Sequence, residues 1–238
     1  MGTGGPPGTG PDRNHRLFPE AIVLKVFPLS IPQRSILLAL FLFFLASSGP
    51  LGAAERAQVI AVLDGDTIVL KGGQKVRYLG IDAPELGKEG RPDEFLAREA
   101  FETNRRWVLN QNVLLVFGPE KEDRYHRRLA YVFLESGLFV NSELVKRGLA
   151  HVLYQGPDLE RWEELLRLQQ EAIKAKRGIW ERALQESETF YQGNGRTRKL
   201  HRPGCPLAAL IGKANVVRFS SKKEAYLKGF SPCRNCKP

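Results

Sequence analysis

Three short segments carry the residues best suited to chemistry. They are Asp64–Thr67, Arg77–Glu85 and Asp123–Arg127. Carboxylates in such segments can hold a hard cation, and arginines beside them can hold a phosphate through parallel hydrogen bonds. This combination predicts a site that hydrolyses phosphodiester bonds.

Asp66 and Asp82 are the predicted ligands of a Ca²⁺ ion. Asp66 begins one expected strand and Asp82 ends another, so neighbouring strands can bring both carboxylates to one end of a barrel. Two carboxylates, a backbone carbonyl and water form an oxygen cage that suits Ca²⁺, and the absence of His or Cys in the two segments that carry these aspartates argues against zinc. Asp64 is better explained as a turn residue, because Asp-Gly turns use that side chain on their own backbone.

Glu85 and two arginines complete the predicted catalytic set. Glu85 follows Pro84 and lies three residues beyond Asp82, so we expect it to face the ion site as the general base for water. Arg77 and Arg127 are the expected phosphate ligands and stabilise the charge of a five-coordinate phosphorus. Any one of these residues alone is more often a solvated surface residue. Together, the two aspartates, Glu85 and the two arginines fit one reaction, phosphodiester hydrolysis, and this favours a catalytic role.

The hydrophobic pattern of residues 55–182 predicts the elements that position this set. The expected strands cover residues 58–63, 67–71, 74–81, 112–117 and 128–134. Three helices are expected, with Pro92 in the first turn of one and with Asn141 and Asp158 as N-caps of the others. The links between the first three strands are too short for a crossover helix. The predicted fold class is therefore mainly β with α, a small and mostly antiparallel barrel with helices outside it.

Residues 56 to about 180 resemble the staphylococcal nuclease (thermonuclease) family. The resemblance rests on the three segments above and on the closing Gly178-Ile179-Trp180. It implies a five-stranded OB-fold barrel with three helices. It also implies a Ca²⁺-dependent phosphodiesterase of the endonuclease type that acts on DNA and RNA.

The resemblance also implies roles for single residues. The backbone carbonyl of Ala83 would be a Ca²⁺ ligand, and Tyr125 and Tyr154 would bind the nucleotide. The roles that the family pattern implies for the charged residues agree with those deduced above, for Asp66, Asp82, Glu85, Arg77 and Arg127. His126 departs from the family, which usually has Gly before the second arginine. Gly often marks a backbone φ above zero, which His tolerates less well, so this departure affects the placement of Arg127.

Four metal-binding residue types lie in two close pairs near the C-terminus: His201 with Cys205, and Cys233 with Cys236. One imidazole and three thiolates are the ligands that tetrahedral zinc requires. A disulfide with one reactive thiol, in an oxidising compartment, is the alternative. A segment this small buries little surface by itself, so a structural zinc ion is physically sensible.

Residues 183–238 thus read as a linker and a zinc-binding module that looks like the Ada-type module. A strand is expected at residues 216–219. Ser221 and Glu224 form a capping box for a short helix that Gly229 ends. Basic residues near Arg198 could hold nucleic acid by its phosphates.

An apolar run at residues 36–46 precedes the predicted enzyme. It follows Arg34, and the small residues Gly52 and Ala54 occupy the −3 and −1 positions of a cut after Ala54. This pattern predicts that residues 1–54 are an N-terminal extension with a signal peptide, and that the protein is secreted or periplasmic. An uncleaved anchor through residues 36–46 is the alternative, although the run is shorter than the roughly 20 residues that span a bilayer.

The net charge of +10 favours a polyanionic partner, either nucleic acid or an anionic membrane face. We expect DNA, RNA or both as partners, with no obligate protein partner evident and membrane contact only through an uncleaved anchor. The competing class is a non-catalytic extracellular OB-fold protein that binds nucleic acid. A degenerate binding domain would lack some of the five charged residues, and this chain has all five.

Overall fold

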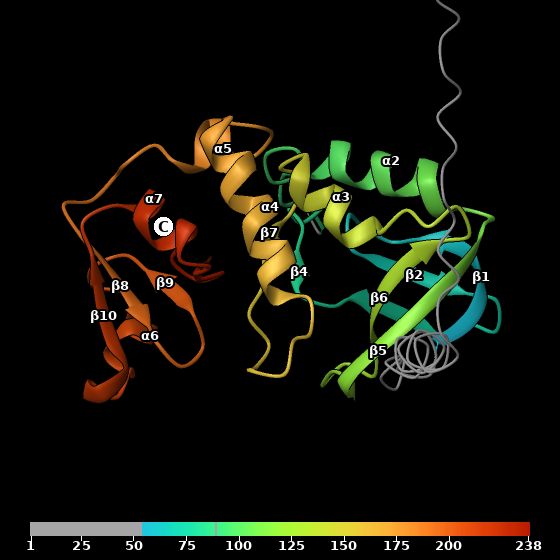
Figure 1. Ribbon diagram of the computed structural model, residues 1–238. Coiled ribbons are helices and arrows are strands. Elements are labelled where there is room, and N and C mark those ends of the chain that lie inside the picture. The colour runs from blue at the N-terminus through green and yellow to red at the C-terminus, as the bar shows by residue number, and fades with distance from the viewer. Residues whose placement is uncertain (1–53, 89) are drawn as a thin grey trace, which may run out of the picture. The chain divides into compact units, whose positions relative to one another are not determined.

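A computed structural model describes residues 54–88 and 90–238, and these residues form one compact unit (Figure 1). The apolar run at residues 36–46 lies outside the described residues, as does the expected signal peptide except for its last residue, Ala54. No helix in the described part of the chain combines the length and the apolar character that crossing a bilayer requires.

Five strands close into a barrel in the order β1-β2-β3-β6-β5 (Figure 1). Their bounds are β1 Ala54–Val62, β2 Thr67–Leu70, β3 Lys75–Tyr78, β5 Asn112–Glu122 and β6 Arg128–Leu134. Every neighbouring pair is antiparallel except β3 with β6. The predicted mostly antiparallel, five-stranded barrel is confirmed. Strand β5 runs past its expected end at residue 117, where its register with β6 becomes irregular.

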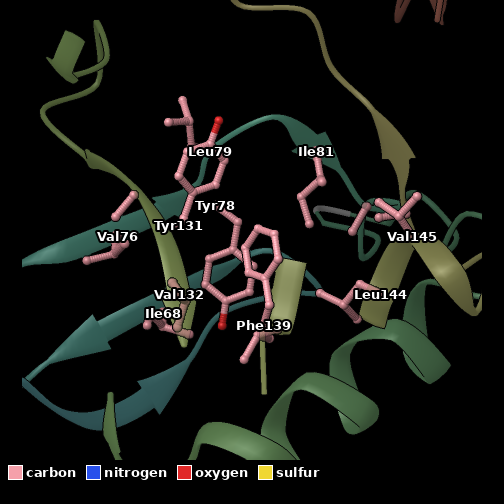
Figure 2. Close-up of a cluster of buried hydrophobic side chains, with 14 of the residues drawn as sticks. Ile68, Val76, Tyr78, Leu79, Ile81, Tyr131, Val132, Phe139, Leu144 and Val145 are labelled. Carbon is pink, nitrogen blue, oxygen red and sulfur yellow. The ribbon is translucent and has the colours of Figure 1, made fainter. Parts of the chain in front are cut away.

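Three helices flank the barrel, as expected: α2 Ala97–Val108, α3 Val140–Lys146 and α4 Trp162–Lys174. A four-residue helix, α5 (Trp180–Ala183), follows. Figure 2 shows Tyr78 of the barrel beside Phe139 of the α3 region, and the Phe139 ring also packs against Tyr131 and Phe133 of β6. Tyr78, Tyr131 and Phe139 belong to one buried cluster. Burying a large apolar side chain contributes about 1.5–3 kcal/mol to stability, so this cluster is what holds the helices to the barrel.

The helix starts differ from prediction at each of the three helices. Helix α2 begins at Ala97, because residues 92–96 form a loop. Asn141 is not an N-cap: it lies inside α3, where its side chain accepts from Val132 N (3.0 Å) and donates to Leu79 O (2.9 Å). Asp158 is not an N-cap either, because Arg161 takes that position in α4. Helix α3 ends at Lys146, just before Gly148, whose φ is 68°, and α4 ends at Lys174, four residues before Gly178.

The described residues form two further sheets outside the barrel. Strand β4 (Ile81–Asp82) pairs with β7 (His151–Val152). The C-terminal module holds a four-stranded sheet in the order β10-β8-β9-β11. Its bounds are β8 Tyr191–Asn194, β9 Lys199–His201, β10 Val216–Phe219 and β11 Ser231–Pro232, with α6 Pro206–Ala209, the 3-10 helix η1 Lys213–Asn215 and α7 Lys222–Leu227 between strands.

The expected elements of the module are present. Strand β10 has the predicted bounds, and the Ser221 hydroxyl accepts from Glu224 N at 3.1 Å to cap α7. Gly229, with a φ of 76°, ends that helix. The module shares a buried apolar cluster with the end of α4 and with α5, in which Ile173 and Trp180 pack with Tyr226 and other module residues. The barrel domain and the module are therefore packed together, not merely linked.

Candidate catalytic site and metal centre

The turn between β1 and β2 sets the position of Asp66. Asp64 Oδ1 accepts from Asp66 N at 3.0 Å, so Asp64 acts as the turn residue that the sequence predicted. The buried Tyr78 hydroxyl donates to Asn104, whose amide donates to the Asp64 carbonyl at 3.1 Å. Gly65 packs so closely that an added Cβ would lie 2.7 Å from the Ala83 Cβ. The turn is thus fixed between the barrel and α2.

Arg77 bridges the two predicted calcium-binding aspartates. Its Nη1 lies 2.9 Å from Asp66 Oδ2 and its Nη2 lies 2.5 Å from Asp82 Oδ1. Ala83 N also donates to Asp66 Oδ2, at 2.6 Å. The side chains of Arg77 and Asp82 are each only 6% exposed, so this group of charges lies at the buried base of the site. Asp66 and Asp82 converge as expected.

Glu85 lies at the exposed edge of the same group. Its backbone N–H donates to Glu94 Oε2 at 2.9 Å, and Glu94 N donates back to the Glu85 carbonyl at 3.0 Å. These two bonds fix the loop that carries Glu85. The Glu85 side chain is 40% exposed, so it can meet water or substrate.

Two residues that the sequence did not single out also reach Asp82. His151 faces it across the β4–β7 pair, with Nε2 at 3.7 Å from Asp82 Oδ2. Arg234 of the C-terminal module lies 2.5 Å from Asp82 Oδ1 and 2.6 Å from Glu85 Oε1. His151 could have been found from a predicted β4–β7 register. No local pattern relates residue 234 to residue 82.

A cavity of about 550 Å³ opens beside these groups. Asp82, Ala83 and Glu85 line it from the barrel side, and Arg202 and Arg234 line it from the module. A substrate in this cavity would therefore touch both parts of the molecule.

The pKa values of the two aspartates shift in opposite directions, because neighbouring cations outweigh the effect of burial only at Asp82. Burial raises the pKa of Asp66 well above that of a free Asp, although Arg77 opposes this shift. Burial would also raise the pKa of Asp82, but Arg77, His151 and Arg234 outweigh it and lower that pKa to about 2. The group holds the carboxylates of Asp64, Asp66, Asp82 and Glu85 against the guanidinium groups of Arg77 and Arg234. Carboxylate oxygens of Asp66 and Asp82 and the Ala83 carbonyl are the kind of donor set that fits a divalent cation such as Ca²⁺.

Arg127 makes its ion pair outside this group of charges. It pairs with Asp123, with Nε at 2.8 Å and Nη2 at 2.7 Å from Asp123 Oδ2. His126, just before it, has a φ of 57°, the conformation for which the family pattern uses Gly. The structure therefore brings four of the five predicted charged residues together and leaves Arg127 in the β5–β6 turn.

The two predicted nucleotide-binding tyrosines lie in different settings. Tyr125 is 61% exposed in the β5–β6 turn, with the guanidinium groups of Arg124 and Arg127 over its ring. Tyr154 packs edge-on against Trp162, and the Arg198 guanidinium lies 4.9 Å from its ring centre. Tyr125 is open to solvent beside two arginines, whereas Tyr154 is covered on one side by the module.

The C-terminal ligands form a compact cluster. One ligand atom from each of His201, Cys205, Cys233 and Cys236 lies within 4.8 Å of the others, and all three cysteines are free thiols. Burial and the charge of Lys199 lower the pKa of His201, which favours the neutral imidazole that binds metals. Arg202 N donates to Cys236 Sγ at 3.3 Å, and such a backbone donor stabilises a thiolate that binds metal. The cluster suits a structural zinc ion and shows no disulfide.

We expect one tightly bound zinc per chain, measured by elemental analysis of purified protein. Replacing Cys236 by Ser should lower zinc occupancy and the melting temperature together, because ligand binding contributes directly to folding of a small metal domain. Ser220→Ala, an exposed change in the same module, is the control. Protein that lacks zinc and has two of its three thiols paired would contradict the assignment.

The chain matches the family described as "Staphylococcal nuclease homologue" over residues 75–182 and the "Metal binding domain of Ada" over residues 176–238. It is 36% identical over 154 residues to the "Thermonuclease" of Staphylococcus hyicus, covering 60% of this chain and 90% of that protein. It is 38% identical over 132 residues to the "Thermonuclease" of Staphylococcus intermedius, covering 54% and 77%. The "Endonuclease YncB" of Bacillus subtilis (strain 168) is 36% identical over 126 residues, covering 51% and 59%.

Proposed function

Because the chain belongs to the staphylococcal nuclease family and is a nuclease, we propose that it is an exported, Ca²⁺-dependent phosphodiesterase that cuts DNA, RNA or both. The observation that carries the proposal is the convergence of Asp66, Asp82, Arg77 and Glu85 beside one cavity. Phosphodiester hydrolysis needs carboxylates that can hold a cation, a guanidinium group beside them and a carboxylate that water can reach, and this site contains all three.

In this proposal Asp66, Asp82 and the Ala83 carbonyl would hold the ion. A bound Ca²⁺ would polarise the phosphate and offset charge at the transition state. Arg77 holds the two aspartates in place through its paired hydrogen bonds. Glu85, fixed by its loop and open to solvent, accepts a proton from the attacking water or orients it. Arg127 would bind phosphate after giving up its pair with Asp123.

Nuclease assays with purified residues 50–238 test the proposal. We expect cleavage of plasmid and of single-stranded RNA in Ca²⁺, its loss in EDTA, and its return when Ca²⁺ is restored. Asp82→Asn should weaken Ca²⁺ binding, measured by calorimetry, and reduce cleavage, whereas Asp158→Asn, an exposed residue, should change neither. Nucleic-acid binding without chelator-sensitive cleavage would favour the non-catalytic binding protein instead.

Export is a separate part of the proposal. It rests on the apolar run at residues 36–46 and on the small residues before a cut after Ala54. N-terminal sequencing of material from the culture medium and from membranes tests it. A mature chain that starts near residue 55 supports secretion, and a chain that retains residues 36–46 in membranes supports an anchor.

A further inference from the structure

The loop between Cys233 and Cys236 carries an arginine that reaches the proposed catalytic site. Arg234 Nη2 lies 2.5 Å from Asp82 Oδ1, and its Nη1 lies 2.6 Å from Glu85 Oε1. One guanidinium group thus touches both an expected cation ligand and the expected general base. Its side chain is 58% exposed and lines the cavity beside them.

The other arginines of the proposed site are less available to a substrate. Arg77 is 6% exposed, and its two terminal nitrogens are already used by Asp66, Asp82 and the Tyr78 carbonyl. Arg127 is held by Asp123. Among the ion pairs of residues 54–88 and 90–238, Arg234 alone joins an exposed guanidinium to this carboxylate group.

The position of Arg234 is set by the fold of the module. Cys233 N donates to the Leu200 carbonyl at 2.8 Å, and Lys237 N donates to the Cys233 carbonyl at 2.9 Å, so the loop is tied at both ends. Lys237 Nζ also lies 2.7 Å from Glu94 Oε1, in the segment that holds Glu85. Gln169 of α4 donates to the Tyr226 carbonyl of the module at 2.7 Å, within the shared buried region. A residue on such a supported loop can act with the precision that a catalytic group requires.

We propose that the zinc-binding module completes the nuclease site by supplying Arg234 as a ligand of the substrate phosphate. Without substrate, Arg234 neutralises Asp82 and Glu85. Once a divalent cation neutralises the carboxylates, its guanidinium is free to bind the phosphate of a bound nucleotide chain through two parallel hydrogen bonds. This inference rests on the proposed nuclease function and adds a residue from outside the barrel to it.

Three variants of residues 50–238 test the proposal: Arg234→Ala, Arg234→Lys and the control Lys223→Ala. Lys223 is an exposed cation of the same module on α7, so its loss changes the net charge equally. The readouts are kcat and KM on a single-stranded oligonucleotide in Ca²⁺, Ca²⁺ affinity by calorimetry, zinc content and melting temperature. The parent protein must first cleave, because a parent without cleavage would contradict the nuclease function and not the role of Arg234.

We expect Arg234→Ala to lower kcat by about 10²- to 10³-fold, the usual loss for one donor to a developing charge, at unchanged zinc content and without weaker Ca²⁺ binding. Arg234→Lys should recover part of the loss because it keeps the charge without the fork. Lys223→Ala should match the parent. Unchanged kcat in Arg234→Ala would overturn the proposal. Higher activity with tighter Ca²⁺ binding would also overturn it and would make Arg234 an inhibitory contact.

Discussion

Replacing Arg77 by Met should lower the free energy of unfolding by about 3–5 kcal/mol, because it leaves two buried carboxylates without their shared partner. Arg77 is the cation that bridges Asp66 and Asp82 at the base of the site. Met fills much of the same volume, so the loss would reflect charge more than packing. Urea unfolding of zinc-loaded residues 50–238 in Ca²⁺-free buffer measures it.

The pH dependence of the unfolding free energy distinguishes lost charge pairing from lost packing in the Arg77→Met variant. Without Arg77, the pKa of Asp66, which burial already raises, rises further, and the pKa of Asp82 loses the largest of the contributions that lower it. The folded state then binds protons more readily, so the stability deficit is largest at neutral pH and shrinks as pH falls. Added Ca²⁺ should restore part of the stability. A deficit that is constant with pH would contradict this explanation.

Arg128→Met is the matched control for Arg77→Met. Arg128 pairs with Glu55 at 2.6 Å, but this pair lies nearer the surface of the barrel, and the Glu55 side chain is 44% exposed. Solvent screens such a pair, so its loss should cost about 1 kcal/mol or less. Equal losses in the two variants would show that burial of the Asp66–Arg77–Asp82 group does not matter.

Replacing Glu85 by Gln should lower kcat by about 10²- to 10⁴-fold while the protein stays folded. Gln keeps the shape of the side chain but cannot accept a proton from the attacking water. Glu85 is partly exposed and its backbone, not its side chain, anchors the loop, so the melting temperature should change little. Single-turnover cleavage of an oligonucleotide in saturating Ca²⁺ measures the chemical step.

Glu99→Gln provides the control for Glu85→Gln. Glu99 is exposed on α2, so its replacement by Gln removes the same carboxylate from a position outside the proposed site. It should retain the parent rate. A Glu85→Gln protein that cleaves as fast as Glu99→Gln would remove Glu85 from the proposed mechanism.

Local sequence patterns were sufficient to predict the barrel and the residues at the base of the site. Alternating strands and Gly turns predicted the five barrel strands, and the segments around Asp66 and Asp82 lie at adjoining strand ends. These features depend on residues close in sequence or on neighbouring strands. The zinc cluster was predicted for the same reason, because its ligands occur in two short pairs.

Tertiary contacts decided the features that the sequence did not predict. Asn141 has the composition of an N-cap, but its amide instead bonds two buried backbone groups of the barrel region. Arg234 reaches Asp82 only because the module packs on α4, a contact between residues 152 positions apart. Arg127 fits the family pattern, yet the local carboxylate of Asp123 holds its side chain.

The apolar cluster shared by α4, α5 and the C-terminal module has a thermodynamic consequence. Ile173 and Trp180 lose their cover if the module opens, so each part depends on the other for stability. A metal bound at the four C-terminal ligands then also protects the barrel against heat and proteases, and a nucleotide chain held at the barrel protects the metal cluster. Two regions with separate relatives thus behave as one cooperative unit.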